Sequence, residues 1–146
     1  MATDETAVTT LSAEECWEAL LASSLGRIAL AVGGVIDIFP VNYIAHDGVL
    51  TIRTSEGTKL IELVVNPHIA FEIDGVGRED AWSVVVKGSA RILSTEAEIA
   101  AVEQLGLRPL APTEKHVWVR IDPTSISGRR FVLGPAPDDT RSFTNV

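Results

Sequence analysis

Hydrophobic residues recur with a period of two along most of the chain, which is the spacing of a strand with one buried face. The pattern predicts strands at roughly 27–32, 35–45, 49–54, 68–74, 82–93, 116–122 and 125–133. Gly33-Gly34 separates the first two strands and His46-Asp47-Gly48 the next two, and both are turn sequences of the hairpin type. We therefore expect the first three strands to form an antiparallel meander.

Three short helices are expected among these strands. Ser12 and Glu15 have the spacing of a capping box, and apolar pairs four residues apart follow them, so a helix should run to about residue 23. A second helix is expected after Gly57, and a third over about 95–105. Because strands and helices do not alternate, a doubly wound sheet is excluded. The expected fold is mainly β, an antiparallel barrel that is closed or nearly closed.

Composition and charge limit the class of protein. The 146 residues suffice for one domain, expected at 11–133 between a flexible leader (1–10) and a Pro/Asp-rich tail (134–146). A net charge of −8 leaves no continuous basic face, so we expect neither nucleic acid nor a membrane as a partner. With Cys16 as the only cysteine, no signal-peptide pattern and no membrane-span pattern, we expect a cytoplasmic protein.

The stretch IRTSEGTKL, residues 52–60, is a candidate phosphate site. If a strand ends near residue 54 and a helix begins near Thr58, Lys59 lies in the first turn of that helix, where the macrodipole disfavours a cation. Free backbone N–H groups at the helix start, the hydroxyls of Ser55 and Thr58, and the cations Arg53 and Lys59 would together bind a phosphate monoester. Gly57 would let the backbone come close to it.

Other readings of the glycine-containing stretches were weighed. A loop of capping residues with two solvated cations explains IRTSEGTKL about equally well. The stretch is not a P-loop, because no earlier glycine stands at the required distance from Gly57. The segment GVGRED is not a dinucleotide fingerprint, because Asp80 replaces its third glycine.

The strand segment FPVNYIA contains a proline, which cannot donate a hydrogen bond to a strand ladder. We expect the strand to be bulged or to lie at a sheet edge at Pro40, and this leaves neighbouring backbone groups available. A flat heteroaromatic ring could take up these groups, with Asn42 bonding its edge and Tyr43 packing against it. A bulge that bends a barrel strand explains Pro40 by itself, and the two readings are compatible.

Together these segments resemble the flavin-binding split-barrel family of pyridoxamine 5′-phosphate oxidase-like proteins. The resemblance spans roughly residues 11–133 and includes FPVNYIAHDGVLTIRTSEGTKLIELVVNPHIAFEID and WSVVVKGSARILS. The family binds the phosphate and ribityl chain of FMN through a T-x-x-G-[ST]-[KR] turn and a following N-P-x-[IVA] strand. The matching positions here are Thr54, Gly57, Thr58, Lys59, Asn66 and Pro67.

The resemblance implies a split β-barrel of Greek-key or meander type that holds FMN, with a deazaflavin as the alternative cofactor. The isoalloxazine would lie along residues 38–43, and Trp82 and Ser83 would approach the ring or the ribityl hydroxyls. The family is usually dimeric with its flavin between two barrels, so a homodimer is expected. The cofactor-binding residues implied are Phe39, Pro40, Val41, Asn42, Tyr43, Arg53, Thr54, Ser55, Thr58, Lys59, Trp82 and Ser83.

The chain departs from the family pattern in two places. Many members carry a second basic residue after Lys59, whereas Leu60 stands here, so Arg53 is expected to supply the second charge. True pyridoxamine phosphate oxidases end in a longer arginine-containing segment, and this chain has only SISGRRFVL and the tail, which argues against vitamin B6 chemistry. For Arg129 and Arg130 a solvated strand end is favoured over a contact with a neighbouring subunit's phosphate.

The remaining candidate residues match no other chemistry. His46, His68 and His116 have no metal-ligand spacing, and no acid–base or nucleophilic residue is assigned. We therefore expect an FMN-dependent oxidoreductase that moves a hydride or electrons between a nicotinamide or deazaflavin donor and a small-molecule substrate. A non-catalytic flavin-, deazaflavin- or haem-binding sensor of the same fold is the alternative, and a flavin-free interaction barrel is a third.

The dimer face is expected on the strands around Trp82 and Trp118. The segments WSVVV and HVWV carry more apolar surface than one inward face can use. Coverage of both faces within the chain is the competing explanation, and the three helices, about thirty residues in total by the pattern above, argue against it.

Overall fold

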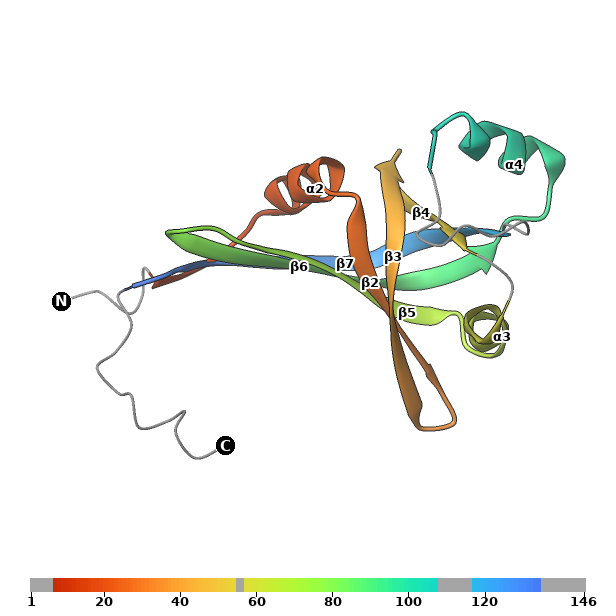
Figure 1. The fold of residues 1–146 in the computed structure, drawn as a ribbon, viewed down its shortest axis with the longest axis horizontal. Coiled ribbons are helices and arrows are strands. Elements are labelled where there is room, and N and C mark those ends of the chain that lie inside the picture. Colours follow the sequence, from red (N-terminus) through yellow and green to blue (C-terminus); the bar gives the residue numbers. More distant parts are fainter. Residues whose placement is uncertain (1–6, 55–56, 108–116, 135–146) are drawn as a thin grey trace.

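The computed structural model describes residues 7–54, 57–107 and 117–134. Within these residues, three helices and seven strands follow one another (Figure 1). Their bounds are β1 Val8–Thr10, α2 Ala13–Ala22, β2 Leu25–Val32, β3 Val35–His46, β4 Val49–Thr54, α3 Thr58–Val65, β5 His68–Val76, β6 Asp80–Ile92, α4 Glu96–Glu103 and β7 Val117–Val132. The strand order β1-β7-β4-β3-β2-β5-β6, with β6 also paired to β7, closes β2–β7 into a ring. The predicted antiparallel barrel is confirmed.

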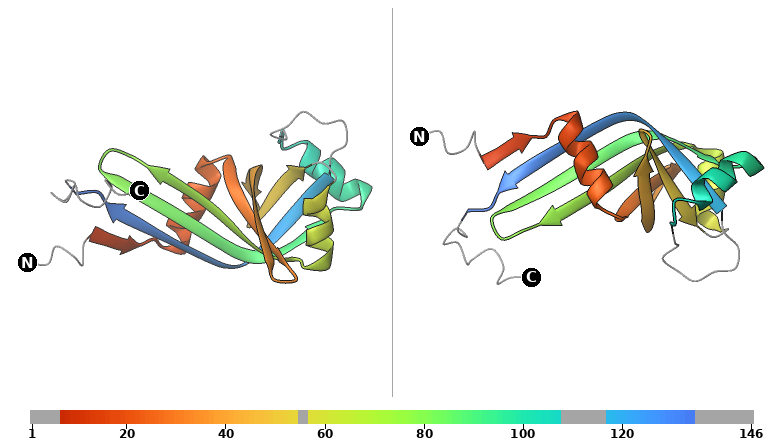
Figure 2. Two further views of the ribbon diagram at one scale, coloured as in Figure 1. Left: turned by 60° about the horizontal axis from the view of Figure 1, so that its bottom comes forward. Right: turned by 90° about the horizontal axis from the view of Figure 1, so that it is seen from above.

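The β2–β3–β4 meander is confirmed, as are both of its turns. Gly33 and Gly34 have φ of 57° and 82°, and Asp47 and Gly48 have φ of 49° and 76°. Two successive residues with positive φ form the type I′ turn, whose twist matches that of the flanking strands. The β2–β3 hairpin projects from the barrel, as Figure 2 shows from two sides.

The ring closes where β6 pairs with β7 along nearly the full length of both strands. The register shifts once, between Lys87 and Gly88, opposite Pro123. A Cβ on Gly88 would lie 2.3 Å from the carbonyl oxygen of Asp122, so only glycine allows this approach. The prediction of two strands at 116–122 and 125–133 is wrong, because Pro123 sits at the register shift, where a missing N–H is tolerated.

The N-terminal segment pairs with the far end of β7. Residues 8–10 of the expected leader form β1, which lies antiparallel to Arg129–Phe131. The capping box predicted for the first helix is present: the Glu15 N–H donates to Ser12 Oγ at 3.1 Å, and the Ser12 N–H donates to Glu15 Oε1 at 3.0 Å. The hydrogen bond from the Ser12 N–H, followed by one from the Ser12 side chain, holds the pKa of the Glu15 carboxyl below its usual value.

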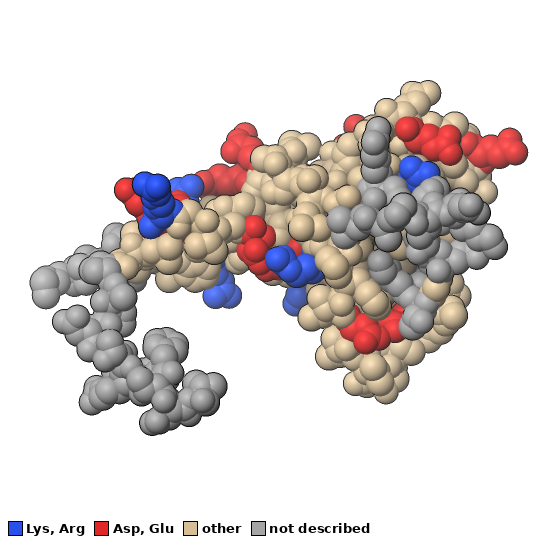
Figure 3. Space-filling view, viewed as in Figure 1, with Lys and Arg blue, Asp and Glu red and all other residues tan. Residues whose placement is uncertain are grey.

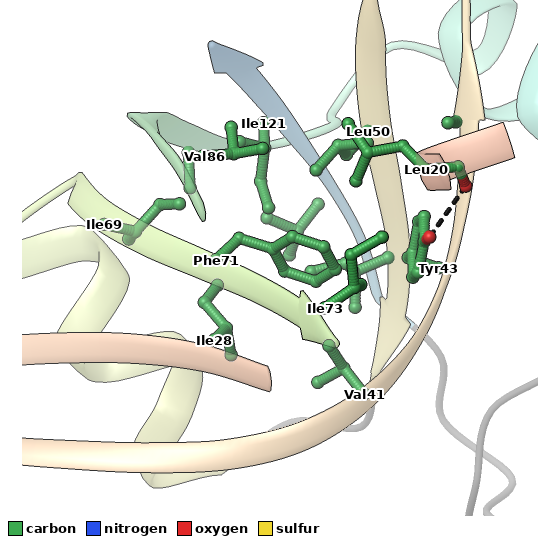
Figure 4. Packing of buried hydrophobic residues seen from close by; sticks show 14 of the residues in the cluster. Leu20, Ile28, Val41, Tyr43, Leu50, Ile69, Phe71, Ile73, Val86 and Ile121 are labelled. Carbon is green, nitrogen blue, oxygen red and sulfur yellow. Dashed lines mark hydrogen bonds between the residues drawn. The ribbon is translucent and has the colours of Figure 1, made fainter. Parts of the chain in front are cut away.

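One hydrophobic core fills the barrel, and Figure 4 shows Phe71 at its centre. Phe71 meets Tyr43 edge-on, with ring centroids 4.9 Å apart. The Tyr43 hydroxyl donates to the carbonyl oxygen of Leu20 at 2.7 Å, which ties α2 to β3. Burial raises the pKa of Tyr43 to about 12.

A second, smaller core lies between α4 and the outer face of the barrel. Trp118 on β7 is 5% exposed and packs with Leu93 and Val102 of the α4 region. The expectation that the strand face around Trp118 is open for a dimer is therefore wrong. Helix α4 covers that face from within the chain, as the competing explanation holds.

The close approach at the β6–β7 seam predicts a large effect of adding one methyl group. Gly88→Ala should lower the free energy of unfolding by about 1–3 kcal/mol, because the new Cβ forces backbone atoms apart. The matched control is Gly134→Ala, where a Cβ meets nothing within 4 Å. Urea unfolding followed by tryptophan fluorescence measures both, and equal midpoints for the two variants would contradict the prediction.

Candidate functional site

The first half of β3 has a partner strand on one side only. Residues Val35–Asn42 of β3 pair with β2, but β3 pairs with β4 only from Tyr43 to His46. The β2–β3 register runs without a shift past Pro40. Of the two explanations offered for Pro40, a position at a strand edge is therefore confirmed, and the ladder with β2 is not bulged.

The parity of the register shows which backbone groups face this edge. The two-residue turn makes Val32 and Val35 a hydrogen-bonded pair, so the odd-numbered residues of this half of β3 bond to β2. The N–H of Tyr43, also odd-numbered, donates to the Ser24 carbonyl oxygen at 2.9 Å, in line with this parity. Ile38, Pro40 and Asn42 thus direct their backbone polar groups toward the edge that has no partner strand among the described residues.

Side chains along the same segment alternate between core and surface. Val41 and Tyr43 are 3% and 1% exposed and point into the barrel, whereas Pro40 and Ile38 lie on the outer face. The idea that the Tyr43 ring packs against a heteroaromatic ligand is therefore wrong, because that ring and its hydroxyl are used in the core. Phe39 is partly buried against the same core.

The turn between β4 and α3 begins and ends where the sequence predicts. Strand β4 ends at Thr54 and α3 begins at Thr58, so the backbone of Lys59 lies in the first helical turn. No described side chain caps this helix start at Gly57. Ser55 lies outside the described residues, as do the side chains of Thr58 and Lys59, so the hydroxyl and ammonium contacts expected of them stay predictions.

Arg53 and Thr54 lie on opposite faces of β4. Thr54 is 7% exposed and continues the inward row of Ile52. The Arg53 guanidinium lies on the outer face, 5.0 Å from the centre of the Trp118 ring, and its Nη1 donates to the Leu107 carbonyl oxygen at 3.3 Å. Its buried Nε has no partner within the described ranges. Arg53 is thus anchored in the fold, unlike the solvated cation of the alternative reading.

Asn66 and Pro67, which match the family motif, form hydrogen bonds to other parts of the fold. The Asn66 side chain donates to the Ala31 carbonyl oxygen at 2.7 Å and accepts the His68 N–H at 3.1 Å. The Pro67 carbonyl oxygen accepts the Ala90 N–H at 2.8 Å. These bonds attach the end of α3 to β2 and β6, and so they fix where its start lies.

Trp82 and Ser83 lie at the opposite end of the molecule from α3. Trp82 pairs with Gly75 and Arg130 on the projecting part of β6, and Figures 1 and 2 show this part far from α3 in every view. It lines a hollow of about 330 Å³ beside α2 together with Glu15 and Arg130. Within one chain, the structure does not bring Trp82 and Ser83 to the β3 edge.

The sequence analysis missed a contact between two carboxyl groups, Asp37 on β3 and Glu62 on α3. Their hydrogen bond is the largest of the causes that raise the pKa of Glu62, followed by burial and by the charge of Asp37. The Oε2 atom of Glu62 is covered by protein and accepts no hydrogen bond from the described residues. The contact places α3 beside the unpaired half of β3.

Charged side chains elsewhere are mixed in sign. Arg27 on β2 bridges Glu72 and Asp74 on β5 at 2.7 and 3.3 Å. On the face drawn in Figure 3, Lys and Arg side chains form small separate groups. None of the helices in the described part of the chain has the length and apolar character needed to cross a membrane.

The Asp37–Glu62 pair predicts a pH dependence of stability. A carboxyl pKa above its unfolded value of 4.5 stabilises the fold below that pH, and this contribution is lost as the pH rises through the folded pKa. Glu62→Gln should therefore make the free energy of unfolding fall less between pH 4.5 and 7.5 than it does in the wild type. Urea unfolding at the two pH values tests this, with the exposed Glu103→Gln as control. A wild-type pH dependence in Glu62→Gln would contradict it.

Comparison with known proteins gives these features a family context. Residues 12–130 match the family described as pyridoxamine 5′-phosphate oxidase. The solved structure of a candidate pyridoxamine 5′-phosphate oxidase from Corynebacterium glutamicum is 43% identical, with a TM-score of 0.82 over 88% of this chain and 96% of that one. The FAD binding protein from Mycobacterium smegmatis is 42% identical, with a TM-score of 0.74 over 86% and 99%.

An uncharacterized Mycobacterium tuberculosis protein, Rv3129, is 41% identical over 91 residues, which are 62% of this chain and 83% of that protein. The family match extends from the capping box of α2 to the outer end of β7 and so includes every strand of the ring. The chain belongs to the pyridoxamine 5′-phosphate oxidase-like family of flavin-binding split barrels.

Proposed function

We propose that this protein binds a flavin nucleotide and uses it to transfer a hydride or electrons to or from a small molecule. The observation that carries the proposal is that α3, whose start no described side chain caps, lies beside the edge of β3 that has no partner strand among the described residues. Glu62 contacts Asp37 on β3, and Thr58 lies four residues earlier on the same face of α3. One ligand could therefore place its ring along β3 and its phosphate at the start of α3.

The start of α3 fits an anionic group. Backbone N–H groups at a helix N-terminus attract phosphate, and no described side chain caps them here. A Cβ built on Gly57 would meet no described heavy atom within 4 Å apart from its chain neighbours. We assign the phosphate to Thr54, Ser55, Thr58 and Lys59. Arg53 would add a positive charge from the outer side of β4.

The edge of β3 fits the polar rim of a flavin ring. In this proposal the backbone of Pro40 and Asn42 bonds the ring. The backbone groups of Phe39, Val41 and Tyr43 point to the other side of the strand and hold the edge in place. When bound, the flavin supplies the hydride and electron chemistry, so the chain needs only to hold and orient it. FMN is the cofactor that we propose. The 42% identical Mycobacterium smegmatis protein is named for FAD, which shares the ring and the first phosphate.

The donor and the catalytic role are proposals as well. We expect a nicotinamide or deazaflavin as the electron donor. The cytoplasmic location is also a proposal, made from the sequence. The absorption spectrum of the purified protein, with the released chromophore identified by mass, separates flavin, deazaflavin and haem. A bound flavin that neither NADPH nor a reduced deazaflavin reduces under anaerobic conditions would favour the non-catalytic sensor.

A second copy of the chain would complete the site. The family resemblance assigns Trp82 and Ser83 to the flavin, yet one chain keeps them at the far end from α3. They could reach a flavin only from a partner. An apolar surface is available for that contact on the outer face of the hairpin and on α3, at Ile36, Ile38, Ile61, Val64 and Val65, each 63–73% exposed.

Lys59→Ala should weaken FMN binding by about ten- to a hundred-fold, because a charge-assisted hydrogen bond contributes roughly 1.5–3 kcal/mol. Arg53→Ala should weaken it less, since Arg53 already interacts with Trp118 and Leu107. The matched control is Lys87→Ala, at an exposed position of β6. Titration followed by flavin fluorescence measures each affinity. Unchanged binding in Lys59→Ala and in Arg53→Ala would place the phosphate elsewhere.

Ile38→Glu should shift the protein from dimer to monomer and weaken flavin binding with it, because a charge would enter the proposed interface. The control is Leu21→Glu, at a residue of similar exposure on α2. Sedimentation velocity with and without FMN reads the assembly directly. A wild-type monomer that still shields one flavin per chain from a quencher would overturn the dimer.

A further inference from the structure

A hollow of about 370 Å³ lies on the outer side of β3, between the end of α2 and the end of α4. It is formed by three separate parts of the chain: the link from α2 to β2, the middle of β3, and the segment that follows α4. Its lining includes Ser23, Ser24, Asn42, Ile44, Leu105 and Leu107. No sequence pattern indicates this hollow, because the three segments are distant along the chain.

Among the residues that the structure describes, the lining carries no charged side chain. Its polar groups are two serine hydroxyls, one amide and backbone, and the rest is leucine and isoleucine surface. Tyr43 also borders the hollow, but its hydroxyl donates to Leu20 and its pKa is raised to about 12, so it stays neutral. An ionised ligand would lose its hydration here without a counter-charge among the lining residues.

A cation stands behind one wall. The Arg53 guanidinium donates to the Leu107 carbonyl oxygen and lies over Trp118, which holds the segment after α4 against the barrel. Arg53 does not line the hollow. Arg53 thus holds this wall in place, but its charge does not face the hollow.

We infer that this hollow binds the second substrate of the protein, a compact, uncharged ring compound that carries a carbonyl or amide group. Its volume is at the small end of ligand sites, which are about 300–1,000 Å³. The inference rests on the proposed function in one respect: the hollow meets β3 at Asn42 and Tyr43, within the segment assigned to the flavin ring. A phosphorylated substrate such as pyridoxamine 5′-phosphate does not match this lining.

Two isosteric probes test the inference: 2-naphthamide, which is neutral, and 2-naphthoate, which is an anion at pH 7.5. Both are titrated into ¹⁵N-labelled protein, with and without bound FMN, and followed by NMR. The amide signals of Ile44, Leu105 and Gly106 should shift with naphthamide. Naphthoate should bind at least about ten-fold more weakly, because its charge is not compensated. Equal or tighter naphthoate binding, or shifts located elsewhere, would overturn the inference.

A charge placed in the lining provides the second test. Ser24 is exposed at the rim, and Ser24→Lys should reverse the preference so that naphthoate binds more tightly than naphthamide. Ser94→Lys, at an exposed position outside the lining, should keep the wild-type order. An unchanged preference in Ser24→Lys would place the probes at another site.

The same samples distinguish the two proposals. Flavin binding that depends on Lys59, without naphthamide shifts at the hollow, would refute the substrate site alone. Naphthamide shifts at the hollow in a protein that binds no flavin would refute the proposed function, and with it the role of the hollow as a second-substrate site.

Discussion

The pairing of β6 with β7 is the interaction on which the rest of the structure depends. It turns an open sheet into a ring, so that most strand edges are satisfied within the barrel. Several stretches of the ring have a partner strand on one side only among the described residues, and Val35–Asn42 is one of them, because the pairing of β3 with β4 ends at Tyr43. This edge of β3 can bond a ligand without opening the fold, and the proposed cofactor site lies there.

Helix α3 lies beside this edge through contacts that differ in kind. Asn66 bonds the end of the helix to β2, and Leu63 enters the core at 4% exposure. The Asp37–Glu62 contact works against this attachment of α3, because two neighbouring carboxyl groups disfavour the ionised form of Glu62. Local conflicts of this kind tend to occur at functional positions, where the fold is held together by other contacts. This one lies at the proposed cofactor groove.

The structural features that could be predicted from the sequence are those set by residues close together along the chain. Gly33-Gly34, Asp47-Gly48 and the Ser12–Glu15 capping box act within a few residues, and each was predicted correctly. Two strands were expected at 116–122 and 125–133 instead of one, since the register shift that accommodates Pro123 depends on β6. Tyr43 was assigned to a ligand because alternation alone does not say which face is the core. Its bond to Leu20 decides this, and it joins segments 23 residues apart. The cover that α4 gives Trp118, the distance of Trp82 from α3 and the stacking of Arg53 likewise exist only once the ring has closed.

The two sites proposed along β3, one for the cofactor phosphate and one for the substrate, differ in charge. Beside its unpaired edge, the helix start and Lys59 would hold a phosphate, so an anion there meets backbone dipoles and a cation. A few residues further along the same strand, the hollow at Asn42 and Ile44 is neutral, and Arg53 is turned away from it toward Trp118. An anionic substrate would compete for the phosphate turn and gain nothing in the hollow. A neutral one would be excluded from the turn and accepted beside the ring. If both proposals hold, the strand would discriminate cofactor from substrate by charge, before any shape complementarity is considered.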